Sequence, residues 1–203
     1  MKKFVFLATA FAVLSAPVAA ADQPYRVRGT IVSLSGSTLN VMTNAGPTVA
    51  VVLSEKPRVS YVVKADLATI VPGSYLGVVS APQPDGTIRA IAINIFPEAL
   101  RGVGEGSRPY DLAPASTMTN AAVSANAPLK VDNVDARVIT LTYKDGEKKV
   151  VVPTGTPIVT SAPADTTALV PGGKVSINAV KHDDGTITAA SVNVGKDGLT
   201  PPN

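Results

Sequence analysis

The stretch Pro84-Asp-Gly-Thr-Ile88 decides the fold class predicted for this chain, because it closes a β-hairpin. An Asp-Gly pair between two apolar, alternating runs is a strong hairpin signal, and here it joins residues 75–80 to residues 87–95. Its last four residues return as Asp184-Gly-Thr-Ile187, 99 positions later. A second hairpin of the same kind is therefore predicted near the end of the chain.

Residues around the two hairpins also repeat at a nearly constant distance along the chain. The offset is 100 in the first part of the repeat and 99 after a one-residue deletion. A constant offset with one deletion over roughly fifty positions indicates an internal duplication. The matched residues are Gly46 with Gly146, Pro57 with Pro157, Asp66 with Asp165, Val71-Pro-Gly73 with Val170-Pro-Gly172, and Asn94 with Asn193.

Each copy of the repeat predicts short strands and no long helix. Residues 25–34 alternate apolar and polar side chains, and β-branched residues fill 58–63, whereas no helical period lasts beyond about two turns. Closure into a barrel would remove the exposed edges of such short strands. The expected fold is all-β, with two tandem small OB-like β-barrels joined by an ordered linker. A small β-sandwich in each half is the alternative.

The predicted domain boundaries follow from the repeat and from the first residues. Met1-Lys-Lys3, a short apolar run and Pro17-Val-Ala-Ala-Ala21 are typical of a secretory signal peptide, cleaved after Ala20 or Ala21. We therefore expect an exported, periplasmic protein with no spanning segment. The predicted parts are a signal peptide over 1–21, barrel repeat 1 over 22–97, a Gly/Pro-rich linker over 98–121, barrel repeat 2 over 122–195, and a C-terminal tail over 196–203, which is either poorly ordered or a strap on the second barrel.

Composition excludes several classes of function. Without Lys2 and Lys3 the chain has 16 basic and 15 acidic residues, which does not predict a nucleic-acid partner. Cysteine is absent and His182 is the single histidine, so neither a transition-metal site nor a Ser-His-Asp or Cys-His constellation is expected. No catalytic residue, metal ligand or cofactor is predicted.

The linker is the one long stretch that the repeat does not explain. Glycines 102, 104 and 106 alternate along it and could expose amide groups as an anion-binding nest. An ordered strap that packs between the barrels is the structural alternative, and we favour it. The residues expected to contact a ligand or partner are Glu105, Arg108, Tyr110, Asp111, Thr117, Thr119 and Asn120.

The linker also carries a resemblance to a family. The segments Gly104-Glu-Gly-Ser-Arg-Pro-Tyr-Asp111 and Ser116-Thr-Met-Thr-Asn120, with the ending Val194-Gly-Lys-Asp-Gly-Leu-Thr-Pro-Pro202, resemble a family of uncharacterised exported proteins of proteobacteria. The resemblance covers nearly the whole mature chain and implies its fold and compartment. Members are sometimes labelled metal-transporter permeases, but this chain has Ser107 where the family usually has His, and Tyr110 where it often has Trp.

Three hypotheses of function follow. The first is a soluble, non-enzymatic periplasmic module that binds a small ligand or protein of the cell envelope through the linker and the facing barrel surfaces. The second is a periplasmic accessory protein of an envelope complex or metal-uptake system. The third is a hydrolase that uses linker carboxylates such as Glu105 and Asp111.

Overall fold

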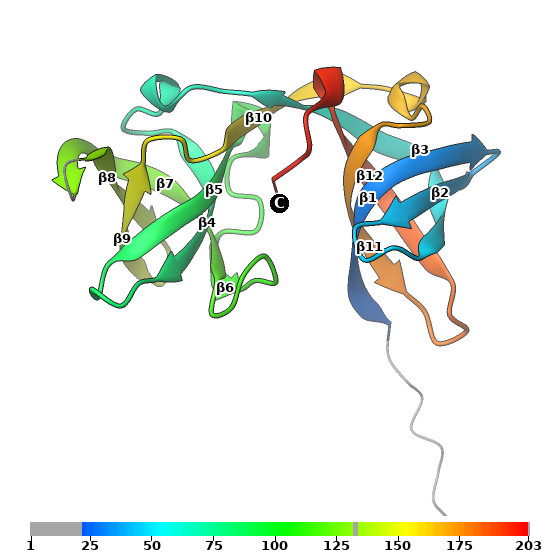
Figure 1. The fold of residues 1–203 in the computed structure, drawn as a ribbon, viewed down its shortest axis with the longest axis horizontal. Helices are drawn as coiled ribbons and strands as arrows, with labels where there is room; N and C mark the ends of the chain where they lie inside the picture. The colour runs from blue at the N-terminus through cyan, green and yellow to red at the C-terminus, as the bar shows by residue number, and fades with distance from the viewer. Residues whose placement is uncertain (1–21, 132–133, 203) are drawn as a thin grey trace, which may run out of the picture.

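The computed structural model describes residues 22–131 and 134–202, and they form an all-β fold (Figure 1). The predicted signal peptide lies outside the described residues. No helix among the described residues is long and apolar enough to cross a membrane. The strands are β1 (Gln23–Ser35), β2 (Thr38–Thr43), β3 (Thr48–Lys64), β4 (Tyr75–Pro82), β5 (Ile88–Ile95), β6 (Gly106–Pro109), β7 (Thr117–Val131), β8 (Val134–Tyr143), β9 (Gly146–Pro153), β10 (Ile158–Ala164), β11 (Lys174–Lys181) and β12 (Ile187–Gly195). Four 3₁₀ turns connect them: η1 (Leu67–Thr69), η2 (Glu98–Leu100), η3 (Thr166–Ala168) and η4 (Lys196–Gly198).

Five strands close the first ring, which lies at the right of Figure 1. Strand β1 pairs with β2 on one side and with β11 on the other, and all of these neighbours are antiparallel. Strands β2–β3 and β11–β12 continue the sheet, and a parallel β3–β12 pair closes it. Because the sheet meets itself, this barrel leaves no open sheet edge among these strands.

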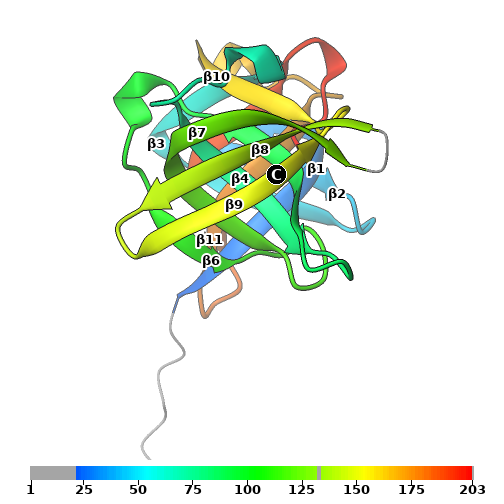
Figure 2. The same ribbon diagram turned by 90° about the vertical axis from the view of Figure 1, so that its left-hand side faces the viewer.

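The second ring, at the left of Figure 1, has the same order of pairings. Strand β4 pairs with β5 and β7, and β7, β8 and β9 follow in turn, as Figure 2 shows from the outer side. One parallel bridge between Arg89 and Val151 joins β5 to β9. The short strand β6 is added to the beginning of β7.

Each ring takes strands from both halves of the chain, so the prediction that 22–97 and 122–195 each close their own barrel is wrong. The first ring contains β1, β2 and β3 of the first half with β11 and β12 of the second. The second ring contains β7, β8 and β9 with β4 and β5 of the first half. The two halves have therefore exchanged their last hairpins. The linker prediction is also corrected, because β6 and the beginning of β7 fall inside residues 98–121 and belong to the second ring.

The exchange has its physical cause in strand β3. It is 17 residues long, and a strand of that length spans roughly 55 Å. Its first part pairs with β2 of the first ring. Its last part, Val59 to Lys64, pairs antiparallel with β10, and Val59 to Val62 also pair with β12. Strand β10 in turn pairs with β5 of the second ring. The chain therefore leaves the first ring along the β3–β10 bridge at the top of Figure 1, and η1, β4 and β5 follow on the other side.

The β3–β10 bridge is symmetric in the numbering of the two halves. Tyr61 pairs with Ala162, and Val62 pairs with Ser161. Residue 61 of the first pair and residue 161 of the second pair are 100 positions apart, and so are residues 62 and 162. The crossing point of the two halves therefore lies between residues 61 and 62 of one strand and residues 161 and 162 of the other.

Each ring encloses its own apolar core. In the first, Leu39 and Val51 of the early strands pack with Ile177 and Val192 of the late ones. In the second, Leu76 and Ile93 of the exchanged hairpin pack with side chains of β7, β8 and β9. Full burial of an aliphatic side chain contributes about 1.5–3 kcal/mol, so each half depends on the other for much of its core.

The predicted hairpin turns are confirmed. Gly86 and Gly185 have φ of 81° and 86°, and these are the only positive φ values in the two turns. Asp85 Oδ1 accepts hydrogen bonds from the Thr87 amide at 2.9 Å, and Asp184 Oδ1 accepts one from the Thr186 amide at 2.8 Å. A glycine with positive φ suits a tight hairpin turn, because it has no Cβ to clash in that conformation.

The exchange predicts that residues 22–97 produced alone will not unfold cooperatively as a monomer. They lack β11 and β12, so Val27, Leu39 and Val41 lose the strands that cover them. Circular dichroism during thermal unfolding, with sedimentation to select the monomer, measures this. Addition of residues 98–203 is expected to restore a cooperative transition. A sharp transition of the monomeric fragment would contradict the exchanged topology.

Candidate functional site

The linker residues before β7 form a strap (residues 98–116) that runs from β5 to β7 along the second ring. Arg101 anchors its start: its guanidinium pairs with Glu98 and donates a hydrogen bond to the Gly73 carbonyl at 2.8 Å. Glycines 102, 104 and 106 have φ of 82°, 60° and 116°, which is the left-handed backbone expected of them. The strap is thus a defined series of turns.

The hydrogen bonds inside the strap differ from those expected of an anion-binding nest, in which free amide groups would point at a ligand. The amide of Glu105 donates to the Gly102 carbonyl at 3.3 Å, so it closes a turn. The carbonyls of Val103 and Gly104 accept from Asn120 and Arg108, both at 3.0 Å. The side chains of Asn120 and Arg108 therefore hold the strap by donating hydrogen bonds to its carbonyl groups.

Tyr110 and Asp111 hold the strap to the other ring. The Asp111 carboxylate accepts two hydrogen bonds from Arg28 of β1, at 2.9 and 3.1 Å, and forms an ion pair with Arg26 at 3.3 Å. The Tyr110 hydroxyl accepts a hydrogen bond from Arg28 at 3.3 Å, and the Arg26 guanidinium lies 4.2 Å from the centre of the Tyr110 ring. Because a bidentate arginine–carboxylate pair fixes orientation, this contact clamps the strap to the first ring.

The clamp also determines the charge of its members. Hydrogen bonds from Arg28 hold the pKa of the Asp111 carboxyl below its usual value, and the same contact raises the pKa of Arg28. Asp111 is thus kept ionised, which is the opposite of what a general acid requires. Glu105 is used elsewhere, because its carboxylate accepts the Lys144 amide at 2.9 Å. The two linker carboxylates therefore contact different parts of the fold: Asp111 contacts β1, and Glu105 contacts the turn after β8.

The remaining predicted residues lie on β7. Asn120 is buried and donates to the strap, while its Oδ1 has no hydrogen-bond partner and abuts Gly77, where a Cβ would approach it to 3.0 Å. Thr117 and Thr119 face the interior of the second ring and contact the amine of Lys148. The seven predicted residues therefore divide into a clamp, strap supports and a hydroxyl pair, and they do not converge on one ligand.

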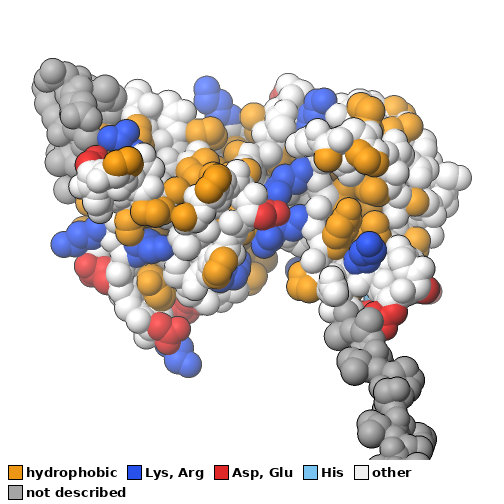
Figure 3. Space-filling view, turned by 60° about the horizontal axis from the view of Figure 1, so that its bottom comes forward, with side chains coloured by type: hydrophobic (Ala, Val, Ile, Leu, Met, Phe, Trp, Pro, Cys, Tyr) orange, Lys and Arg blue, Asp and Glu red, His pale blue; other side chains and the backbone are white. Residues whose placement is uncertain are grey.

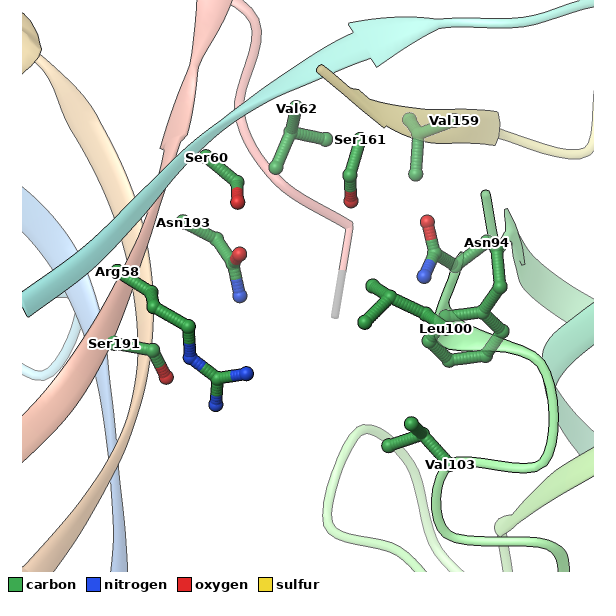
Figure 4. A pocket seen from close by; sticks show the side chains of 11 residues that line it. Arg58, Ser60, Val62, Asn94, Leu100, Val103, Val159, Ser161, Ser191 and Asn193 are labelled. Atoms are coloured by element: carbon green, nitrogen blue, oxygen red, sulfur yellow. The ribbon is translucent and has the colours of Figure 1, made fainter. Parts of the chain in front are cut away.

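A cavity of about 250 Å³ lies between the two rings, beneath the β3–β10 bridge (Figure 4). Four polar side chains of the first ring form one wall, and they are neighbours in the sheet: Ser191 pairs with Arg58, and Asn193 pairs with Ser60. The full lining is Arg58, Ser60, Val62, Asn94, Phe96, Leu100, Val103, Val159, Ser161, Ser191 and Asn193.

The opposite wall is mostly apolar. Leu100 and Val103 of the strap point into the space from the side of the second ring, as Figure 4 shows. Phe96, which follows β5, packs against Tyr75 with the ring centres 5.6 Å apart. Asn94 is the polar group on this side. The cavity therefore has a polar wall from one ring and an apolar wall from the other.

Arg58 is the unusual residue of this cavity. Within the described residues its guanidinium makes no ion pair and no hydrogen bond, although its side chain extends over the cavity (Figure 4). Figure 3 shows Lys and Arg side chains gathered in the hollow between the rings. Arg26 and Arg28 share the Asp111 carboxylate across the clamp, whereas Arg58 has no carboxylate partner among the described residues.

Sequence reasoning missed Arg58 and its three neighbours. The alternation of Arg58 with Ser60 and of Ser191 with Asn193 marks one face of two strands. Nothing in either segment shows that the two strands are parallel partners, because one comes from each half of the chain.

The C-terminal tail lies at the junction of the rings. Figure 1 shows the described chain ending between them, and Pro201 is buried there. Leu199, Thr200 and Pro202 line a second cavity of about 550 Å³, which shares Val159 with the first. The tail was predicted to be either poorly ordered or a strap on the second barrel. Its packed position at the junction agrees better with a strap.

Metal-binding groups do not assemble in the described part of the chain. No cluster of three or more His, Asp or Glu side chains occurs among residues 22–131 and 134–202. His182 contacts Asp22 and Thr188, each at 2.8 Å. It therefore joins the first described residue to the last hairpin.

Comparisons of this chain with protein-family models, curated proteins and solved structures give no match. The class of protein is defined by its strand pairing: an all-β chain with a closed five-stranded barrel and further strands.

Replacing Asp111 by Asn is expected to lower the free energy of unfolding by about 1 kcal/mol near neutral pH, since this half-exposed carboxylate is screened by solvent. A lowered folded-state pKa means that its contribution is present above the unfolded pKa and is lost as pH falls through the folded one. Denaturation of both proteins between pH 7 and pH 2 measures the difference. A difference that persists at the acid end would contradict this account.

Proposed function

We propose that this chain is a binding module of the periplasm whose ligand site is the cavity between the two rings. Residues 1–21 support export, because they have the features of a signal peptide. The uncompensated charge of Arg58 supports the site, since an arginine beside hydroxyl and amide groups favours an anionic ligand.

We also propose that the fold arose by duplication of an OB-like unit. The order β1–β2–β3–β12–β11, with one parallel pair, is that of a five-stranded Greek-key barrel. The second ring repeats this order with strands displaced by 99 or 100 residues, which agrees with the sequence repeat. The exchange of hairpins places the cavity between two related units.

The chemistry of the two walls supports a particular class of ligand. Arg58, Ser60, Ser191 and Asn193 offer hydrogen-bond donors to an anionic group, while Leu100 and Val103 offer apolar contact. A small organic acid with an apolar body satisfies both walls, and the volume of about 250 Å³ excludes a bulky one. The same walls offer less to inorganic phosphate, which has no apolar part.

Hexanoate is a suitable probe of this proposal, with hexanamide as its neutral counterpart. Calorimetric titration is expected to detect hexanoate binding to the full chain, and Arg58→Ala is expected to weaken it about tenfold or more. Lys56→Ala is the matched control, because Lys56 is an exposed cation of the same strand outside the cavity lining. Equal affinity of the wild type and Arg58→Ala would contradict the proposed site.

The second candidate function is an accessory role in an envelope complex or metal-uptake system. Val32 and Met42 favour it, because both are 48% exposed on neighbouring strands of the first ring. Capture of one stoichiometric envelope protein that is lost on Met42→Ser, but kept on Arg58→Ala, would select this role over ligand binding.

A further inference from the structure

The side chain of Lys148 enters the second ring near one end of that ring. It lies on β9 and alternates with Val150 and Val152, which are fully buried, so it shares their inward face. Its amine lies 3.0 Å from Ser107 Oγ, 2.9 Å from Thr117 Oγ1 and 3.2 Å from Thr119 Oγ1. Three hydroxyl groups from β6 and β7 therefore surround one amine.

This hydroxyl cage contains no carboxylate. Within the described residues Lys148 forms no ion pair, and burial without a counter-charge lowers the pKa of its amine. The ammonium form donates three hydrogen bonds to the three oxygens. The neutral form donates two and accepts one, so the same cage also satisfies a deprotonated amine. A carboxylate in place of one hydroxyl would have stabilised the charged form alone.

The three hydroxyls differ in access. Ser107 is exposed on the short strand β6, whereas Thr119 is fully buried. Ser107 and Thr119 are register partners, and their hydroxyl oxygens lie 2.9 Å apart. The buried threonine thus orients an exposed serine that has an amine behind it.

We propose that Ser107 and Lys148 form a Ser–Lys pair that hydrolyses small acyl esters. Ser107 Oγ attacks the ester carbonyl carbon as Lys148 Nζ takes the hydroxyl proton. The bond to the leaving alkoxide breaks, and the alkoxide takes that proton from Lys148. Water then attacks the acyl-serine, again giving a proton to Lys148, and the carboxylic acid leaves as Ser107 regains its hydrogen.

In this site Ser107 is the nucleophile, Lys148 is the general base, and Thr117 and Thr119 are positioning residues that accept hydrogen bonds from the amine. The site is separate from the cavity that contains Arg58, because none of its four residues lines that cavity. It also differs from a carboxylate hydrolase, since neither Glu105 nor Asp111 takes part in the reaction.

Labelling of the full chain with a fluorophosphonate tests the proposal, with mass spectrometry to locate the modified residue. The expected result is modification at Ser107, with a rate that rises with pH as the Lys148 amine loses its proton. Lys148→Met and Lys148→Arg are each expected to slow labelling about a hundredfold or more, since a general base contributes that much. Lys149→Met, which removes an exposed neighbour on the same strand, is the matched control and is expected to label as the wild type does.

Hydrolysis of p-nitrophenyl acetate gives an independent readout, which Ser107→Ala is expected to reduce to the uncatalysed rate. If Lys148→Met fails to fold, Lys148→Arg decides, because arginine keeps the charge and the donors but cannot act as a base. Labelling spread over several hydroxyls, or unchanged labelling of folded Lys148→Arg, would overturn the Ser–Lys pair. Hexanoate binding at the Arg58 cavity is unaffected by either outcome.

Discussion

The structure depends on one constraint: strand β3 continues without a turn from the first ring into the β3–β10 bridge. Its residues near Val51 complete the first core, while its last residues pair with a strand that touches the second ring. Because β3 carries the chain to the bridge, the hairpin that follows lies beside the other ring. The exchange of β4–β5 and β11–β12 follows from this geometry.

The exchange also creates the surfaces on which chemistry can occur. Arg58 and Asn193 lie close together because β3 and β12, which belong to different halves, are parallel neighbours. The strap supplies the other wall, and its Asp111 clamps to Arg28 of the first ring. The cavity therefore belongs to neither half alone, and its shape depends on the same bridge and clamp that hold the rings together.

Each of the two candidate sites contains a cation that has no carboxylate partner among the described residues. Arg28 and Arg101 each have a carboxylate, and their charges serve the fold. Arg58 and Lys148 have none among the described residues, so the charge of Arg58 is available to a ligand and the amine of Lys148 to a reaction. Partial burial without a counter-charge disfavours the charged form of the Lys148 amine, whereas the exposed Arg58 keeps its charge beside the cavity.

Local chemistry was readable from the sequence alone. The Asp-Gly turns, the alternating strands and the glycines of the strap each depend on residues close in the chain, and Asp85, Gly86 and Gly104 have the expected conformations or contacts. Partner choice was not readable, because each hairpin meets an equivalent ring in either half. The continuation of β3 into the β3–β10 bridge places the next hairpin beside the distant ring, and only the tertiary structure shows it. The pair of Lys148 and Ser107 was not readable either. The two residues are 41 positions apart, and nothing in the sequence separates them from the many other serines and lysines; the folded chain brings them together.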